Sequence, residues 1–151
     1  MMENKMFRMK TLILFLSALF LMGFTTEATK KKKPPKVKSV SFGKIRVDGV
    51  LYDHDIVIEG YEVRKRKKGP SKPFRSEYRH TPLTPLEEIP WDCKVMVIGI
   101  GMSERLPVTD EFKKMAEEKG VTLVMMRTPD AVEYYNENFT EDTNAIFHVT
   151  C

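Results

Sequence analysis

The second half of the chain alternates apolar runs with amphipathic segments. Lys94–Ile98 and Val121–Met126 are near-continuous apolar runs, which is typical of strands covered on both faces. Between them, Thr109 is placed to cap a helix in which apolar residues recur every three or four positions. Thr128, which is followed by proline, begins a second helix, and Ala145–Val149 is a last apolar strand. This order predicts a βαβαβ unit with parallel strands and right-handed crossovers.

The stretch from Val40 to Lys68 consists of short apolar segments separated by glycines, which predicts an antiparallel meander of short strands. Residues 69–73 (GPSKP) predict a loop. Thr84 followed by proline predicts a short helix that ends at Pro90. Residues 40–151 are therefore predicted to be one α/β domain: a mixed β-sheet with packed helices, a small β-rich N-terminal part and a βαβαβ C-terminal half.

Residues 11–24 form the most apolar segment, with three basic residues before it and small residues at Thr26 and Ala28 after it. This is the pattern of a signal peptide, and a helix of this length reaches about 21 Å, less than the roughly 30 Å of a bilayer core. We interpret residues 1–28 as a cleaved signal peptide, and the protein as exported (secreted, periplasmic or in the secretory pathway). The alternative is an uncleaved membrane anchor, because six lysines between Lys30 and Lys38 favour retention of the C-terminal side in the cytoplasm.

Charge is divided unevenly along the chain. Residues 30–80 hold 16 Lys/Arg against 6 Asp/Glu, whereas residues 81–151 hold 6 against 13, so the net charge of +4 conceals a basic front and an acidic back. Residues 29–39 are lysine-rich with two prolines and predict an extended linker, and Lys30–Lys38 can contact an anionic membrane surface. The run Arg64–Lys68 is interpreted as a solvated edge strand with lysines that prevent aggregation. Nucleic acid is disfavoured as a partner because of the acidic second half and the exported address.

Two cysteines, Cys93 and Cys151, leave the thiol chemistry open. In an oxidising compartment they could form one disulfide, with two free thiols as the default. His148 lies three residues before Cys151, so an imidazole and a thiol could act together as a nucleophilic pair. Neither the number nor the spacing of His and Cys residues matches a zinc site. We therefore expect no metal, no cofactor and no assigned catalytic residue.

Glycines follow the first buried strand in the sequence Ile98-Gly-Ile-Gly-Met-Ser103. A dinucleotide-binding loop is disfavoured because Glu104 stands where the third glycine is needed, and its charge would repel a pyrophosphate. One interpretation is a tight turn that requires glycine for positive φ or for close packing. The other is a pocket in which Ser103 and the backbone amides of the turn bind a small anion or a peptide.

Motifs along residues 40–151 occur in an order that resembles the adipogenesis-associated Mth-type domain family, whose relatives include mitochondrial complex I assembly factors. The motifs are Ser41-Phe-Gly-Lys-Ile45, Val47-Asp-Gly49, Tyr52, His80, Val97–Ser103, Thr128-Pro-Asp-Ala131, Tyr135-Asn136 and Phe147–Cys151. The resemblance implies a single α/β domain, a ligand cleft near the glycine turn, and no settled enzymatic activity. The family positions present in this chain are Gly99, Gly101, Ser103, His80, Ala131, Asn136 and His148.

Together, these features lead us to expect an exported or membrane-tethered, non-catalytic protein-binding or assembly factor with an unidentified protein partner. The expected ligand cleft comprises Gly99, Gly101, Ser103, His80, Asn136 and His148. The alternative is a small-anion-binding or thiol-dependent enzyme that uses the Gly99–Ser103 turn with His148 or Cys151.

Overall fold

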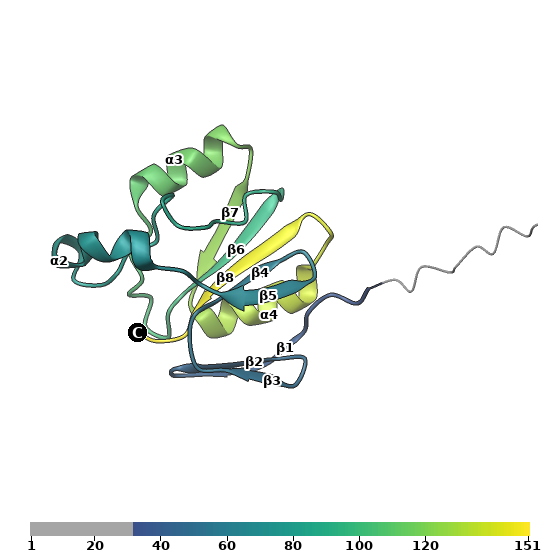
Figure 1. The fold of residues 1–151 in the computed structure, drawn as a ribbon. Helices are drawn as coiled ribbons and strands as arrows, with labels where there is room; N and C mark the ends of the chain where they lie inside the picture. Colours follow the sequence, from purple (N-terminus) through teal and green to yellow (C-terminus); the bar gives the residue numbers. More distant parts are fainter. Residues whose placement is uncertain (1–31) are drawn as a thin grey trace, which may run out of the picture. The chain divides into compact units, whose positions relative to one another are not determined.

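The computed structural model describes residues 32–151 (Figure 1). The signal peptide or anchor predicted over residues 1–28, and the first residues of the predicted linker, lie outside this range. None of the helices within residues 32–151 is long and apolar enough to cross a membrane. The first strand begins at Val37, inside the predicted linker, and the side chain of Val37 is buried.

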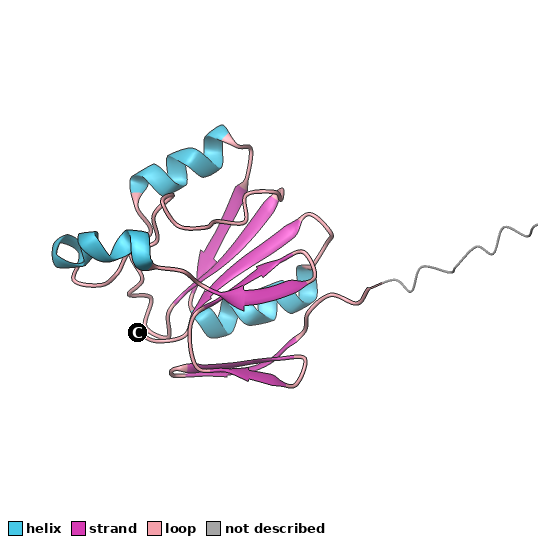
Figure 2. Cartoon of the chain, in the orientation of Figure 1, coloured by secondary structure: helices cyan, strands magenta, loops and turns pink. Residues whose placement is uncertain are grey.

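A five-stranded mixed sheet forms the centre of the domain (Figure 2). Its order is β5 (Glu62–Lys65), β4 (Ile56–Glu59), β8 (Thr143–His148), β6 (Val95–Ile100) and β7 (Thr122–Met126). Strand β6 pairs in parallel with β7 and with β8, whereas β4 runs antiparallel to both β8 and β5. The predicted mixed sheet is confirmed, and so are the parallel strands of the βαβαβ half.

A second sheet of three antiparallel strands lies beside the first, formed by β1 (Val37–Ser41), β2 (Lys44–Val47) and β3 (Val50–Tyr52). The predicted meander is therefore only partly right. Its first three strands form the small sheet, but β4 and β5 join the large sheet, because the apolar residues of β4 pair with those of β8. Strand β5 is an edge strand, as predicted.

Two helices complete the layers of the domain (Figure 1). Helix α4 (Thr128–Asn138) packs with the small sheet against one face, where its partners include Val97 and Phe147. Helix α3 (Asp110–Glu118) packs on the other face, with Met96 and Ile146. Neighbouring residues of a strand point to opposite faces, so β6, and the stretch Ala145–Phe147 of β8, must be apolar at consecutive positions to serve two cores. This explains their continuous apolar runs.

Local structure between β5 and β6 differs from the prediction. The predicted loop at residues 69–73 is a 3-10 helix, η1 (Gly69–Phe74), followed by the short α2 (Arg75–Tyr78). The helix predicted from Thr84 to Pro90 is wrong, because the chain makes a single turn at Pro85 and Leu86 and is irregular after it. The Thr84 hydroxyl does accept a hydrogen bond from the Leu86 amide, but it also bonds Ser71 at 2.8 Å, which ties the segment to η1 instead of starting a helix.

Both cysteines are free thiols. Cys93 precedes β6, whereas Cys151 lies against Gly101, just beyond the other end of the same strand. Six strand residues span roughly 20 Å, far beyond the separation that a disulfide bridges. The two thiols therefore cannot pair within one folded domain, in agreement with the default expectation.

Candidate functional site: a basic pocket at the carboxyl ends of β6 and β8

A pocket of about 170 Å³ opens where the chain leaves β8 and passes α2. We call it the basic pocket, and it is lined by Lys68, Arg75, His80, Thr81, His148, Thr150 and Cys151. Lys68 and Arg75 come from the segment after β5, and His80 follows α2. The last three residues are the end of β8 and the C-terminal tail. Segments far apart in the sequence thus meet in one cationic pocket.

Asp55 holds the wall of the basic pocket together. Its Oδ2 lies 2.8 Å from His148 Nδ1, 3.3 Å from the Arg66 guanidinium and 3.2 Å from Lys68 Nζ, and its Oδ1 accepts the amide of Val149 at 3.1 Å. Burial alone would raise the pKa of the Asp55 carboxyl. The hydrogen bonds from His148 and Val149 and the charges of His148 and Lys68 outweigh burial and hold this pKa well below its usual range. Asp55 is therefore an anion at neutral pH and fixes four donors in and behind the wall of the pocket.

Behind Asp55, a second carboxylate completes a buried network. Glu87 accepts two hydrogen bonds from Arg66, at 2.8 and 2.7 Å, and one from the Ser71 hydroxyl. Arg66 also donates to the carbonyl of Pro82. Buried ions persist only when paired and fully hydrogen-bonded, and this network meets that condition. It connects β5, η1 and the turns after α2, and so positions the segment that carries Lys68, Arg75 and His80.

The imidazole of His148 is bonded at both nitrogens. Nδ1 faces Asp55, and Nε2 lies 3.0 Å from the Thr150 hydroxyl. An acid, an imidazole and a hydroxyl in one chain of hydrogen bonds resemble the arrangement that activates a nucleophile in acyl-transfer enzymes. The side chain of His148 is 10% exposed, so this relay meets the pocket only at its edge.

The glycine turn serves packing. A Cβ on Gly99 would lie 2.8 Å from the Thr128 hydroxyl oxygen, and one on Gly101, whose φ is +106°, would overlap the carbonyl of Cys151. The amide of Gly101 donates to the Thr128 hydroxyl, and the amide of Met102 donates to the carbonyl of Thr150. Both amides are therefore engaged within the protein and are not available to a ligand. The geometry supports the tight-turn interpretation of this motif.

The residues of the expected cleft are divided by the structure. His80 and His148 line the basic pocket, and Gly101 touches it through Cys151. Ser103 is exposed, and it does not line the basic pocket. Asn136 lines a different pocket, where its side chain bonds both backbone groups of Val37.

Sequence reasoning did not identify Asp55, Arg66 or Glu87 as parts of the site. The expectation that the basic run Arg64–Lys68 is a solvated edge is wrong for Arg66, whose side chain is 1% exposed. Side chains alternate between the two faces of a strand, so Arg64, Arg66 and Lys68 are predicted to share one face and the residues between them the other. The pattern does not show which of the three side chains is buried. The carboxylates that receive Arg66 come from distant segments.

The described residues around the basic pocket are not arranged as a metal site. Within residues 32–151, no group of three or more His, Cys, Asp or Glu side chains is arranged to hold a metal ion. The carboxylate nearest to the imidazole of His148 is already shared between Lys68, Arg66 and His148 itself. What the basic pocket offers chemically is a set of donors and positive charges for an anionic group.

Comparison with known proteins identifies the family. The model for a family of proteins of unknown function, DUF498/DUF598, matches residues 37–148. The chain belongs to this family. Every strand and helix described above lies within the matched range. The resemblance to Mth-type domains carried by the ordered motifs is thereby confirmed.

Solved structures show how widely the fold recurs. The chain is 30% identical to a conserved hypothetical protein, PH1505, from Pyrococcus horikoshii OT3, with a TM-score of 0.67 over 77% of this chain and 99% of that one. It is 25% identical to a protein described as MT938, with a TM-score of 0.59 over 78% and 99% of the two chains. A Bordetella pertussis protein described as an Mth938-like domain is 17% identical, with a TM-score of 0.52 over 76% of this chain and 85% of that one, and shares the fold.

Proposed function

We propose that this member of the DUF498/DUF598 family is a non-catalytic protein-binding module, exported or tethered to a membrane, that receives a carboxylate of its partner in the basic pocket. The observation that carries the proposal is the convergence of Lys68, Arg75, His80 and His148 around one small opening. A carboxylate accepts hydrogen bonds from several such donors at once.

The size of the basic pocket favours a side chain or a chain terminus of a protein. Its volume of about 170 Å³ is below the roughly 300–1,000 Å³ typical of pockets that enclose a drug-sized ligand or cofactor. An aspartate side chain or a C-terminal carboxylate fits in such a space while the rest of the partner rests on the surface around it.

The balance of charge favours an anion. Asp55 is already occupied by four partners: His148, Arg66, Lys68 and the amide of Val149. Arg75 is exposed and forms no ion pair with any described residue. A carboxylate entering the pocket therefore meets a free guanidinium beside a wall whose own negative charge is neutralised. A surface charge of this kind increases the association rate more than it increases affinity.

The experiment is an NMR titration of the protein with N-acetyl-aspartate methylamide, with N-acetyl-asparagine methylamide as the neutral probe of the same shape. We expect amide shifts confined to the residues around His80 and Thr150 with the charged probe only, and about tenfold weaker binding for Arg75→Gln, because one charged hydrogen bond is lost. Lys72→Gln is the matched control, since Lys72 is a nearby exposed cation that does not line the pocket. Equal response to both probes, or equal weakening by both variants, would overturn the proposal.

A second candidate function is acyl transfer, because Asp55, His148 and Thr150 form a continuous relay. In this alternative, His148 takes the proton of the Thr150 hydroxyl as its oxygen attacks an ester carbonyl, and an acyl-enzyme forms as the alcohol leaves with that proton. Water then attacks the acyl group while His148 takes its proton, and the acid leaves as that proton returns to the Thr150 oxygen. It predicts that Thr150→Val abolishes hydrolysis of a p-nitrophenyl ester while Cys151→Ala retains it. A thiol-dependent enzyme predicts the reverse.

The proposed export or membrane tethering is tested separately from the basic pocket. N-terminal sequencing of the native protein, together with cell fractionation, distinguishes cleavage after Ala28 from an intact membrane anchor. A native chain that begins at Met1 in a soluble cytoplasmic fraction would refute export and tethering and leave the basic pocket unaffected. Release of the protein from anionic vesicles by salt would support the contact expected for Lys30–Lys38.

A further inference from the structure

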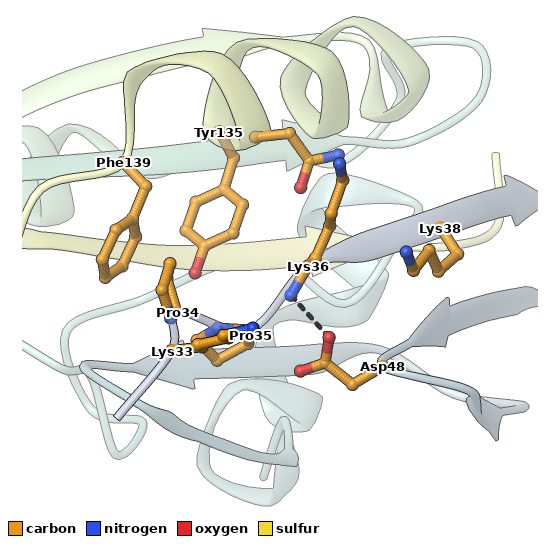
Figure 3. A pocket seen from close by; sticks show the side chains of 9 residues that line it. Lys33, Pro34, Pro35, Lys36, Lys38, Asp48, Tyr135 and Phe139 are labelled. Carbon is orange, nitrogen blue, oxygen red and sulfur yellow. Dashed lines mark hydrogen bonds between the residues drawn. The ribbon is translucent and has the colours of Figure 1, made fainter. Parts of the chain in front are cut away.

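We propose that a second pocket, between α4 and the segment that leads into β1, binds a small carboxylic acid with an apolar body, and that the Tyr135 hydroxyl donates a hydrogen bond to its carboxylate. We call it the Tyr135 pocket (Figure 3). It has a volume of about 550 Å³ and is lined by Lys33, Pro34, Pro35, Lys36, Lys38, Asp48, Tyr135, Asn136 and Phe139.

The hydroxyl of Tyr135 lacks a partner where a partner is needed. Tyr135 is fully buried, and its hydroxyl oxygen forms no hydrogen bond with any described residue. Buried hydroxyl groups are normally hydrogen-bonded, because leaving one unpaired costs folding free energy. In Figure 3 the hydroxyl points away from α4 and toward the segment that carries Pro34 and Lys36. An acceptor supplied by a ligand at this place would satisfy it.

The ring of Tyr135 is held firmly, so the hydroxyl is fixed in direction. Phe139 and Phe147 pack edge-on against it, with ring centroids 5.6 and 5.8 Å away. Burial, assisted by the charge of Asp48, raises the pKa of Tyr135 above its usual value of 10.0. The hydroxyl therefore keeps its proton at neutral pH and acts as a donor, which requires an acceptor such as a carboxylate oxygen.

The rim of the pocket carries positive charge that is not neutralised. The side chains of Lys33, Lys36 and Lys38 are exposed, and none forms an ion pair within residues 32–151. The single carboxylate of the pocket, Asp48, accepts a hydrogen bond from the backbone amide of Lys36 at 3.1 Å, the dashed line in Figure 3. Three cations against one anion favour a negatively charged ligand.

The walls and the volume define the rest of the ligand. Pro34, Pro35 and the ring of Phe139 supply apolar surface beside the charged rim. About 550 Å³ lies within the range typical of pockets that enclose small organic molecules. An apolar body against the prolines and Phe139, with a carboxylate directed at Tyr135 and the lysines, uses every chemical feature of the pocket.

The two ends of the pocket wall are fixed before any ligand arrives. Asn136 accepts the amide of Val37 at 3.1 Å and donates to its carbonyl at 2.8 Å, which fixes the entering chain on α4. Lys36 and Asp48 are also joined through the backbone, because the Asp48 amide donates to the Lys36 carbonyl at 3.0 Å. These bonds fix the two ends of the pocket wall, but the Tyr135 hydroxyl is fully buried, so a ligand oxygen reaches it only when the covering chain at Pro34 and Pro35 shifts.

The test is binding of 2-naphthoate, followed by calorimetry and by NMR, to the wild type and to Tyr135→Phe. The variant keeps the ring and removes only the unpaired hydroxyl, so we expect its melting temperature to stay the same or rise. We expect its affinity for 2-naphthoate to fall about tenfold, the loss of one charged hydrogen bond. Shifts should centre on Tyr135, Asn136 and Lys36, and 2-naphthamide should bind more weakly than 2-naphthoate.

Two further comparisons complete the test. Lys36→Gln with Lys38→Gln should weaken binding of 2-naphthoate and reduce the dependence of that binding on salt, whereas Arg75→Gln, which alters the basic pocket, should not. Octanoate in place of 2-naphthoate determines whether the ligand body is aliphatic or aromatic. Unchanged affinity of Tyr135→Phe for both acids would overturn the inference and leave the partner site proposed above unaffected. Shifts centred on the basic pocket would also overturn the inference, and would instead support carboxylate binding at that partner site.

Discussion

Arg66 and Glu87 are joined by a two-point ion pair inside the domain, with each side chain 1% exposed. The guanidinium presents Nε and one terminal nitrogen to the two carboxylate oxygens, at 2.8 and 2.7 Å. The remaining nitrogen lies 3.3 Å from Asp55. One cation therefore neutralises two buried carboxylates, and it stands between the interior and the basic pocket.

Replacing Arg66 by methionine should be one of the most damaging single changes in the domain. It leaves the carboxylates of Glu87 and Asp55 buried without the cation that they share. Removing one partner of a buried ion pair lowers the free energy of unfolding by about 3–5 kcal/mol. Urea denaturation followed by circular dichroism measures this loss in the free energy of unfolding. Lys67→Met is the matched control, because the exposed Lys67–Glu88 pair contributes no more than about 1 kcal/mol.

The double variant Arg66→Met with Glu87→Leu distinguishes the energy of the Arg66–Glu87 ion pair from that of the other contacts of the two side chains. Because it removes both charges together, we expect it to be more stable than Arg66→Met alone, in a non-additive double-mutant cycle. Additive effects would show that Arg66 acts mainly through Asp55 and the Pro82 carbonyl, and would contradict the central role of Glu87.

Acid should destabilise the domain through Asp55. Its folded pKa lies below the unfolded value of 3.8, so the folded state binds fewer protons than the unfolded state between these two values. The stabilising contribution of Asp55 is therefore complete above about pH 3.8 and is lost as the pH falls toward the folded pKa. Urea denaturation from acid to neutral pH should show Asp55→Asn less stable than the wild type at neutral pH, with the difference shrinking on acidification. A constant difference would contradict this.

Gly101 should tolerate substitution less well than another glycine with positive φ. Gly49 has φ +88° and open space around it, so Gly49→Ala suffers only backbone strain, about 1–2 kcal/mol. Gly101→Ala adds overlap with the Cys151 carbonyl and should cost about 1–3 kcal/mol more. Deleting Cys151 in the Gly101→Ala background should recover part of this extra loss of unfolding free energy. If the extra loss persists in full after Cys151 is deleted, overlap with the Cys151 carbonyl is not its cause, and backbone strain at Gly101 accounts for the whole effect.

The parts of the fold that could be predicted from sequence are those set by local periodicity. The continuous apolar run Lys94–Ile98 identified β6, because a strand between two cores leaves no polar face. The run Val121–Met126 identified β7 as a strand, but β7 lies at the edge of the sheet and its residues are exposed or only partly buried, so the cover expected on both faces is incomplete there. Thr109 was correctly expected to cap a helix, and its hydroxyl accepts the amide of Phe112 at 3.3 Å. Thr84 is also a residue type that caps helices, but no amphipathic run follows it. The chain therefore forms a turn after Thr84 and not a helix.

The site could be predicted only in part, because it depends on contacts between distant segments. His80 and His148 were expected together and do share a pocket. Asn136 was expected with them and instead holds Val37, on the face that carries α4. The inward turn of Arg66 follows from the positions of Asp55 and Glu87, 11 and 21 residues away, and no local pattern encodes those distances.

Cys93 should react slowly with thiol reagents despite being partly accessible. Burial, slightly offset by hydrogen bonds from Asn144, raises the pKa of the Cys93 thiol from 9.0 to about 11. Because the thiolate is the reacting form, at mildly alkaline pH its abundance is about 100-fold below that of a thiol with the unshifted pKa. Alkylation by iodoacetamide, followed by mass spectrometry of the folded protein, should therefore lag behind the same peptide in urea by about that factor. Asn144→Ala, which removes a donor that stabilises the thiolate, should slow the reaction further if the fold is retained. Rapid alkylation of Cys93 in the folded state would show that the segment before β6 opens more readily than its packing implies.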